Sequence, residues 1–127
     1  MLYLPDSTLL VGYGRGQQGA TRWFQTMLNS LEVVGYCAIT VSEVFSGARP
    51  PERAGWREFF SSLQHWPIST EDGAQAGIYR YDFARAGIQL QTTDSLIAAV
   101  AKRVGATIVT DNVKDFPMTD VRVIRPD

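Results

Sequence analysis

Apolar residues along the chain follow two patterns: short runs, and longer stretches in which they recur every third or fourth position. Short runs bounded by turn residues are typical of buried β-strands, and the longer spacing is typical of helices that bury one face. We expect strands at residues 2–4, 33–40, 107–109 and 121–124. We expect helices at residues 7–13, 20–31, 41–47, 51–66, 71–86 and 94–104.

The alternation of short strands with helices decides the expected fold class. It favours an α/β fold of three layers, in which helices cover both faces of a central, mostly parallel sheet of about four to five short strands. The length of 127 residues, without a linker or an internal repeat, indicates a single domain over residues 1–127. An apolar share of 45% is enough to bury a core in a domain of this size.

Two expected helices carry side-chain stripes that bear on function. Trp56, Phe59 and Phe60 have helical spacing, which suits core packing or contact with another protein better than stacking on bases. The helix at 71–86 carries the following residues on one face: Ala74, Ile78, Tyr81 and Arg85.

The charge balance and the counts of cysteine and histidine exclude several classes of protein. With a net charge of −1, the chain must bind any nucleic acid through a local patch or a metal ion. The single cysteine, Cys37, cannot form an internal disulfide, and with the single histidine, His65, it cannot form a zinc site. No targeting segment or membrane span is visible, so we expect a cytoplasmic protein without a membrane partner.

Acidic residues gather where the expected strands end. Asp6 follows the first strand and Glu43 follows the second, while Asp111 and Asp115 follow the third. Asp94 begins a helix and can point to the same place. The carboxyl ends of parallel strands share one edge of a sheet, where ligands of open α/β folds bind. Carboxylates crowded at that edge repel one another unless a cation neutralises them.

Each acid also has a purely structural explanation. Asp6 can cap the helix that follows it, and residues 40–43 fit a capping box. Asp94 can be a first-turn acid favoured by the helix dipole, and the acids after the third strand suit a turn. Several acids at one edge are harder to explain as separate caps, and oxygen ligands without His or Cys indicate magnesium or manganese. Such an ion can activate water against a phosphodiester, so the acidic group is suited to phosphodiester hydrolysis.

Four stretches of the chain resemble the motifs of one nuclease family. The opening MLYLPDSTLL resembles a strand that ends in an Asp, and AITVSEVFSG resembles a strand followed by a Glu on a helix. The most specific stretch is GIQLQTTDSLIAAVAKRVGATIVTDNVKDF, and VRVIRP matches a last strand. Together these motifs resemble PIN-domain nucleases, and VapC-type toxins of toxin–antitoxin systems in particular. The resemblance spans essentially the whole chain and implies a PIN-like fold.

The resemblance also implies a function, a cofactor and partners. A chain of this family is expected to be a Mg²⁺- or Mn²⁺-dependent endoribonuclease that hydrolyses RNA phosphodiester bonds. It is expected to be the toxin of a type II pair, bound by a VapB-type antitoxin and forming a homodimer. The resemblance assigns the metal to Asp6, Glu43 and Asp94. The alternative is a PIN-like module that has lost catalysis and binds RNA or protein.

The fourth metal ligand has several candidates. The family carries an Asp or Asn with a nearby acid at this position, which corresponds here to Asn112 with Asp115. We expect Asp115 in the catalytic cluster, with Asp111 as a possible substitute and Asn112 as a group that orients water. An Asn brings less charge than an Asp, so one firmly held metal ion is the expectation.

Four further residues complete the expected site. The hydroxyl groups of Ser7 and Thr110 are candidates to hold carboxylates or water in place, with capping of a helix or turn as the alternative. Arg80 and Arg85 are candidates to contact an RNA phosphate, with a solvated helix face as the alternative. A phospho-acceptor receiver domain is a less favoured reading, because Asp6 stands alone after its strand.

Overall fold

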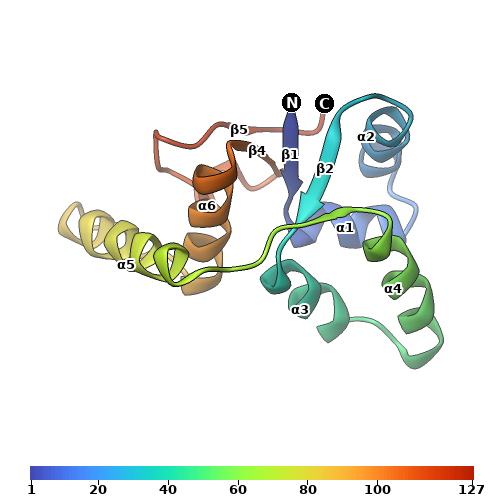
Figure 1. Cartoon of the computed structure of the whole chain (residues 1–127), viewed down its shortest axis with the longest axis horizontal. Helices are drawn as coiled ribbons and strands as arrows, with labels where there is room; N and C mark the ends of the chain where they lie inside the picture. The colour runs from blue at the N-terminus through green and yellow to red at the C-terminus, as the bar shows by residue number, and fades with distance from the viewer.

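The computed structural model covers residues 1–127 and contains one five-stranded sheet (Figure 1). Its strands lie in the order β3-β2-β1-β4-β5 and all neighbouring pairs are parallel. The strands are β1 (Leu2–Pro5), β2 (Val33–Tyr36), β3 (Gln64–His65), β4 (Ala106–Val109) and β5 (Val123–Ile124). The expected α/β fold with a parallel sheet is confirmed, and the order places β1 in the middle with β4 at its side.

Helices cover both faces of this sheet. They are α1 (Ser7–Gly14), α2 (Gln18–Leu28), α3 (Ala38–Ser46), α4 (Arg53–Ser61), α5 (Thr70–Arg85) and α6 (Thr92–Val104). Two short 3-10 helices lie at Pro50–Glu52 and Val113–Asp115. None of these helices combines the length and the apolar character that crossing a bilayer requires.

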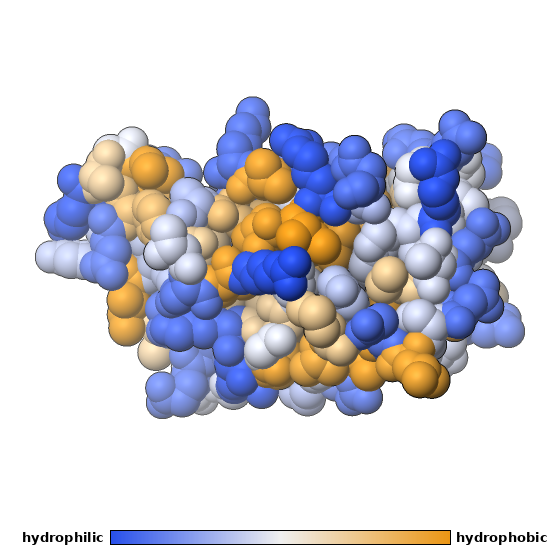
Figure 2. Space-filling model, turned by 90° about the horizontal axis from the view of Figure 1, so that it is seen from above, coloured by the Kyte–Doolittle hydropathy of each residue, from blue (hydrophilic) through white to orange (hydrophobic).

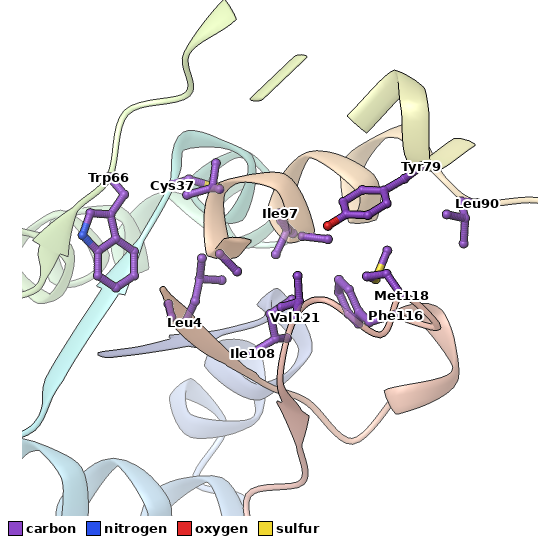
Figure 3. Packing of buried hydrophobic residues seen from close by; sticks show 14 residues of the cluster. Leu4, Cys37, Trp66, Tyr79, Leu90, Ile97, Ile108, Phe116, Met118 and Val121 are labelled. Atoms are coloured by element: carbon purple, nitrogen blue, oxygen red, sulfur yellow. The ribbon is translucent and has the colours of Figure 1, made fainter. Parts of the chain in front are cut away.

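Two apolar clusters hold the layers together. Leu4 and Ile108 point from the sheet toward α5 and α6, into the cluster shown in Figure 3. Val34 and Val109 belong to the other cluster, with side chains of α1, α2 and α4 such as Phe24. Successive strand residues face opposite sides, and a parallel sheet covered on both faces therefore needs apolar residues at nearly every position. Each fully buried side chain of this size contributes about 2 kcal/mol to folding.

The second strand is shorter than expected. It ends at Tyr36, and α3 begins at Ala38 instead of near residue 41. The β-branched residues that indicated a longer strand, Ile39 and Thr40, lie in the first turn of α3, where packing outweighs weak strand propensity. The predicted capping box at residues 40–43 is consequently wrong, and Glu43 lies within a helix.

The sequence prediction also missed β3. This strand contains only two exposed residues, Gln64 and His65, and pairs with β2 at the edge of the sheet. Polar strands of this length have no hydrophobic pattern to reveal them. The residue that follows, Trp66, lies over Gly35 of β2, where an added Cβ would stand 2.4 Å from the indole ring.

The face of α5 described from the sequence is the exposed face. Ile78 and Tyr81 are 53% and 62% exposed, whereas Asp72, Ala76 and Tyr79 are buried. The buried face looked polar because it contains Asp72, which forms an ion pair with Arg103 of α6. A buried charge that is paired can therefore make the buried face of a helix look polar in the sequence, so that the hydrophobic stripe lies on the exposed face.

The two ends of the sheet differ in chemistry. Figure 2 views the end at which β1 begins, where apolar side chains gather among hydrophilic ones. At the opposite end, α1 and α3 lie beyond the carboxyl ends of β1 and β2 (Figure 1). The acidic residues predicted from the sequence lie at that carboxyl end.

Candidate metal centre

Asp6 is the buried member of the acidic group, only 6% exposed at the end of β1. Its Oδ1 accepts a hydrogen bond of 3.0 Å from the backbone N–H of Leu9 and so caps α1. The Thr8 hydroxyl donates to both carboxylate oxygens, at 2.8 and 2.9 Å, and Thr110 Oγ1 donates to Oδ2 at 2.5 Å. Burial raises the pKa of Asp6, while these hydrogen bonds act in the opposite direction and favour the carboxylate.

The loop after β4 holds Thr110 in this contact. The backbone N–H of Thr110 donates to the carbonyl of Ile124 in β5, which extends the sheet by one bond. The Thr110 hydroxyl also accepts a hydrogen bond of 2.9 Å from the Asn112 backbone. Because this fully buried hydroxyl accepts one hydrogen bond and donates another, it has a single orientation, in which its proton points at Asp6.

Asp94 lies in the first turn of α6 and faces three other acids. Burial is the largest cause that raises the pKa of Asp94 to about 6, followed by the charges of Asp115, Glu43 and Asp6. These four residues come from the 3-10 helix at Val113–Asp115, from α3, from the end of β1 and from α6. Four elements far apart in the sequence therefore bring their carboxylates within electrostatic reach of one another.

The rival candidates for the fourth position occupy different places. Asp115 is half-buried and is the charge that acts most strongly on Asp94. Asp111 is exposed and acts on Asp6 instead, while its backbone carbonyl accepts a hydrogen bond from Arg125. Asn112 is half-buried and lines a hollow beside the acids. The geometry therefore distinguishes Asp115, opposite Asp94, from Asp111 and Asn112 at the edge of the cluster.

The carboxylates repel one another but do not close into a ligand cage. No three of the Asp, Glu, His and Cys side chains are gathered tightly enough to coordinate a single ion directly. Like charges spread apart when no cation neutralises them, and this repulsion adds to burial in raising the pKa of Asp94. An all-oxygen donor set that is partly buried and crowded with negative charge fits a hard divalent cation, bound through water or after a small closure.

The structure gives contacts other than the expected ones to three predicted site residues: Ser7, Arg80 and Arg85. Ser7 lines the hollow beside the acids, but the hydroxyl that binds Asp6 belongs to Thr8. Arg80 donates to the carbonyl of Leu90, and the guanidinium of Arg85 lies 4.4 Å from the centre of the Tyr81 ring. Neither arginine forms an ion pair with a carboxylate, so contact with an RNA phosphate stays a prediction for both.

The sequence reading missed two residues beside the acids. Thr8 follows Asp6 by two positions, the spacing at which a hydroxyl reaches back to a capping side chain, so its role was accessible from the sequence. Arg15 lines the same hollow as Glu43, which depends on how α1 packs against α3 and has no local signal. Of the aromatic residues of α4, Phe60 is buried in the core, whereas Trp56 and Phe59 are partly buried and pack against the same cluster.

Comparison with known proteins places these features in a family. The sequence profile described as the PIN domain matches residues 3–120. The chain belongs to the PIN-domain family. Within it, the chain is 35% identical over 118 residues to Ribonuclease VapC19 of Mycobacterium tuberculosis, which covers 91% of this chain and 92% of that protein.

Solved structures of the PIN-domain family share the fold along the full length of the chain. The VapBC2 complex of Rickettsia felis, bound to a promoter DNA fragment, contains a chain that matches with a TM-score of 0.84 and 20% identity. The DNA-bound VapBC complex of Salmonella typhimurium contains one with a TM-score of 0.80 and 25% identity. In both cases the match covers 100% of either chain, so this PIN domain has the fold of VapBC toxins throughout.

The stability of this PIN domain without metal should fall as the pH rises from about 4 to about 6. The pKa of Asp94 is raised from 3.8 to about 6, so in this window the folded chain binds a proton that the unfolded chain has released. Asp94→Asn is neutral at every pH and should be more stable than the parent above that window, by on the order of 1 kcal/mol after solvent screening. Thermal unfolding of both chains in EDTA, at about pH 4 and about pH 7, measures the difference. An identical pH dependence of the two chains would contradict the raised pKa of Asp94, which burial and the neighbouring carboxylates cause.

Proposed function

We propose that this chain is a divalent-metal-dependent endoribonuclease and the toxin of a type II toxin–antitoxin pair. The observation that carries the proposal is the meeting of Asp6, Glu43, Asp94 and Asp115, from four separate elements, at the carboxyl end of the sheet. The likeness to a VapC ribonuclease over nearly the whole chain supports hydrolysis of RNA phosphodiester bonds as the reaction. A cytoplasmic site of action goes with such a substrate.

Asp6, Glu43 and Asp94 are the residues that would hold Mg²⁺ or Mn²⁺, and Asp115 would complete the set from the side of Asp94. When bound, the ion supplies charge neutralisation at the phosphoryl oxygen and lowers the pKa of water. The carboxylates would orient that water and accept its proton as it attacks phosphorus, while the bond from phosphorus to the leaving sugar oxygen breaks and that oxygen is protonated. The Thr8 and Thr110 hydroxyls keep the Asp6 carboxylate fixed in direction through three hydrogen bonds.

The partner that fits this function is a VapB-type antitoxin. The structural matches from Rickettsia felis and Salmonella typhimurium are toxins within VapBC complexes, which supports the same kind of partnership for this chain. A homodimer of the chain is part of the same expectation and stays a prediction.

Cleavage of RNA by the purified protein tests the proposal. We expect cleavage of total bacterial RNA in the presence of Mg²⁺ or Mn²⁺, loss of cleavage in EDTA, and recovery when the metal is restored. Calorimetry with Mn²⁺ alone separates this proposal from an inactive binding module of the same fold. Absence of both cleavage and metal binding in a folded protein would favour that module.

A further inference from the structure

A polar hollow of about 400 Å³ lies beside the carboxylates. It runs along α1, and Val11 is the only apolar residue of its lining. Ser7 and Thr8 stand at one end of α1 and Arg15 just after the other, while Glu43 lies opposite on α3. A hollow with this lining suits a hydrated, polar ligand that extends away from the acidic group.

Arg15 is the only cationic side chain in this lining. Its backbone N–H bonds to the carbonyl of Val11 and ends α1, so the position of the residue is set by the helix. The next residue, Gly16, has φ 73°, which turns the chain sharply and leaves the arginine at the rim. The guanidinium forms no ion pair, although Glu43 lines the hollow, and nearby Glu52 pairs with Arg49 instead. The charge of Arg15 contributes to lowering the pKa of Glu52, but no carboxylate lies within ion-pair distance of the guanidinium, so its N–H donors are available to an anion.

A second polar group lies next to Arg15. The side chain of Gln17 folds back over Gly12 so closely that an added Cβ on this glycine would stand 2.4 Å from Gln17 Oε1. The backbone N–H of Gln17 bonds to the carbonyl of Gly12 at 2.9 Å and fixes this turn. The hollow therefore presents an amide beside a guanidinium, and a guanidinium can donate two parallel hydrogen bonds to phosphate oxygens.

We propose that this hollow binds the RNA phosphate adjacent to the one that is cut, with Arg15 donating to its oxygens. This contact rests on the proposed ribonuclease function, and the acidic residues cannot make it because carboxylates do not donate hydrogen bonds to phosphate oxygens. Asp6 and Arg15 flank the eight-residue helix α1 at its two ends, about 14 Å apart along its axis. The arginine side chain is long and lines the same hollow as Ser7 and Thr8, so its guanidinium can reach back along α1 toward a phosphate next to the one held at the carboxylates. Because the lining of the hollow also contains Glu43 and Asp111, Arg15 is the one side chain through which this hollow can attract the RNA backbone.

Binding of RNA without cleavage tests the role of Arg15. The probe is a fluorescein-labelled single-stranded RNA of mixed sequence, titrated with Asp94→Asn protein and followed by fluorescence anisotropy. We expect Arg15→Gln in this background to weaken binding about 10-fold and to lower the salt dependence of log K by about 0.7, the value for one phosphate contact. Arg15→Lys keeps the positive charge but lacks the paired N–H donors of the guanidinium, so it should recover part of the affinity for RNA.

Arg22→Gln is the matched control. Arg22 is an exposed arginine of α2 that lines a shallow hollow without acidic residues. Its removal changes the net charge by the same amount, so RNA affinity close to that of the parent is expected. Equal weakening by Arg22→Gln and Arg15→Gln would overturn the proposal, because it would indicate a general charge effect.

The rate of cleavage separates binding of a neighbouring phosphate from a part in the reaction. In the otherwise native chain with Mn²⁺, Arg15→Gln should cut saturating RNA at the parental single-turnover rate but need about 10-fold more protein to reach it. A lower rate at saturation, or unchanged affinity, would overturn the inference while leaving the ribonuclease in place. A parent chain that neither binds nor cuts RNA would instead refute the proposed function itself.

Discussion

Asp6→Asn and Asp94→Asn will each slow RNA cleavage by at least about 100-fold, because each removes a charge that holds the metal ion. Asparagine caps a helix about as well as aspartate, so Asp6→Asn keeps the hydrogen bond from Leu9 and the fold of α1. A role for Asp6 as a helix cap alone would therefore leave cleavage intact. The measurement is the rate of RNA cleavage at saturating Mn²⁺, with thermal unfolding to show that both variants are folded.

Asp82→Asn is the matched control for these two variants. Asp82 is an exposed residue of α5 that forms no ion pair, and its replacement removes the same charge. We expect cleavage by Asp82→Asn at the parental rate. Undiminished cleavage by both Asp6→Asn and Asp94→Asn would refute the metal centre, even if the family membership stands.

Arg103→Ala will lower the free energy of unfolding by about 2 kcal/mol, between the values for exposed and buried ion pairs, because Asp72 is buried while the Arg103 side chain is 39% exposed. Arg103 Nε lies 2.9 and 3.1 Å from the two carboxylate oxygens of Asp72, and Nη2 bonds both to Asp72 and to the carbonyl of Pro67. Asp72 is 1% exposed, so the substitution leaves this carboxylate without its cation and with the backbone N–H of Ser69 as its remaining hydrogen-bond donor. Denaturant unfolding measures the loss, which also loosens the contact of α5 with α6, the helix that carries Asp94.

Lys102→Ala controls for the loss of a positive charge from the same helix. Lys102 pairs with Asp120 at 3.0 Å, but these side chains are 43% and 42% exposed, so the expected cost is below about 1 kcal/mol. Burial alone would raise the pKa of Asp72, but Arg103 and Ser69 together lower it below its ordinary value. The difference between parent and Arg103→Ala should therefore shrink as the pH falls below about 4 and through the lowered pKa of Asp72, where this carboxylate of the parent takes up its proton. Equal destabilisation by the two substitutions would contradict the distinction between buried and exposed pairs.

The order of strands and helices was largely accessible from the sequence. The apolar runs around Leu4 and Ile108 predicted buried strands, and the spacing of apolar residues from Leu96 to Val104 predicted α6. These signals are local, since a strand or helix that buries a face repeats its apolar residues with its own period. The two-residue strand β3 has no such period, and only its pairing with β2 defines it.

The acidic residues of the candidate site could be identified from the sequence for a related reason. Asp6 follows a strand directly and Asp94 stands in the first turn of a helix, both positions that the chain order alone locates. Parallel pairing of β1 with β4 then brings the end of one strand beside the end of the other. The contact between Asp6 and Thr110, 104 residues apart, follows from that pairing.

The sequence by itself determined which kinds of elements form, their order, and the placement of carboxylates at the strand ends, because these depend on local periodicity and on parallel topology. Only the tertiary structure decided which acid faces Asp94, which face of α5 is buried, and that Arg15 stands free beside Glu43. Each of these depends on the packing of two helices or a loop that are distant in the chain. Such packing is set by the fit and the charge pairing of many side chains together, which no local pattern records.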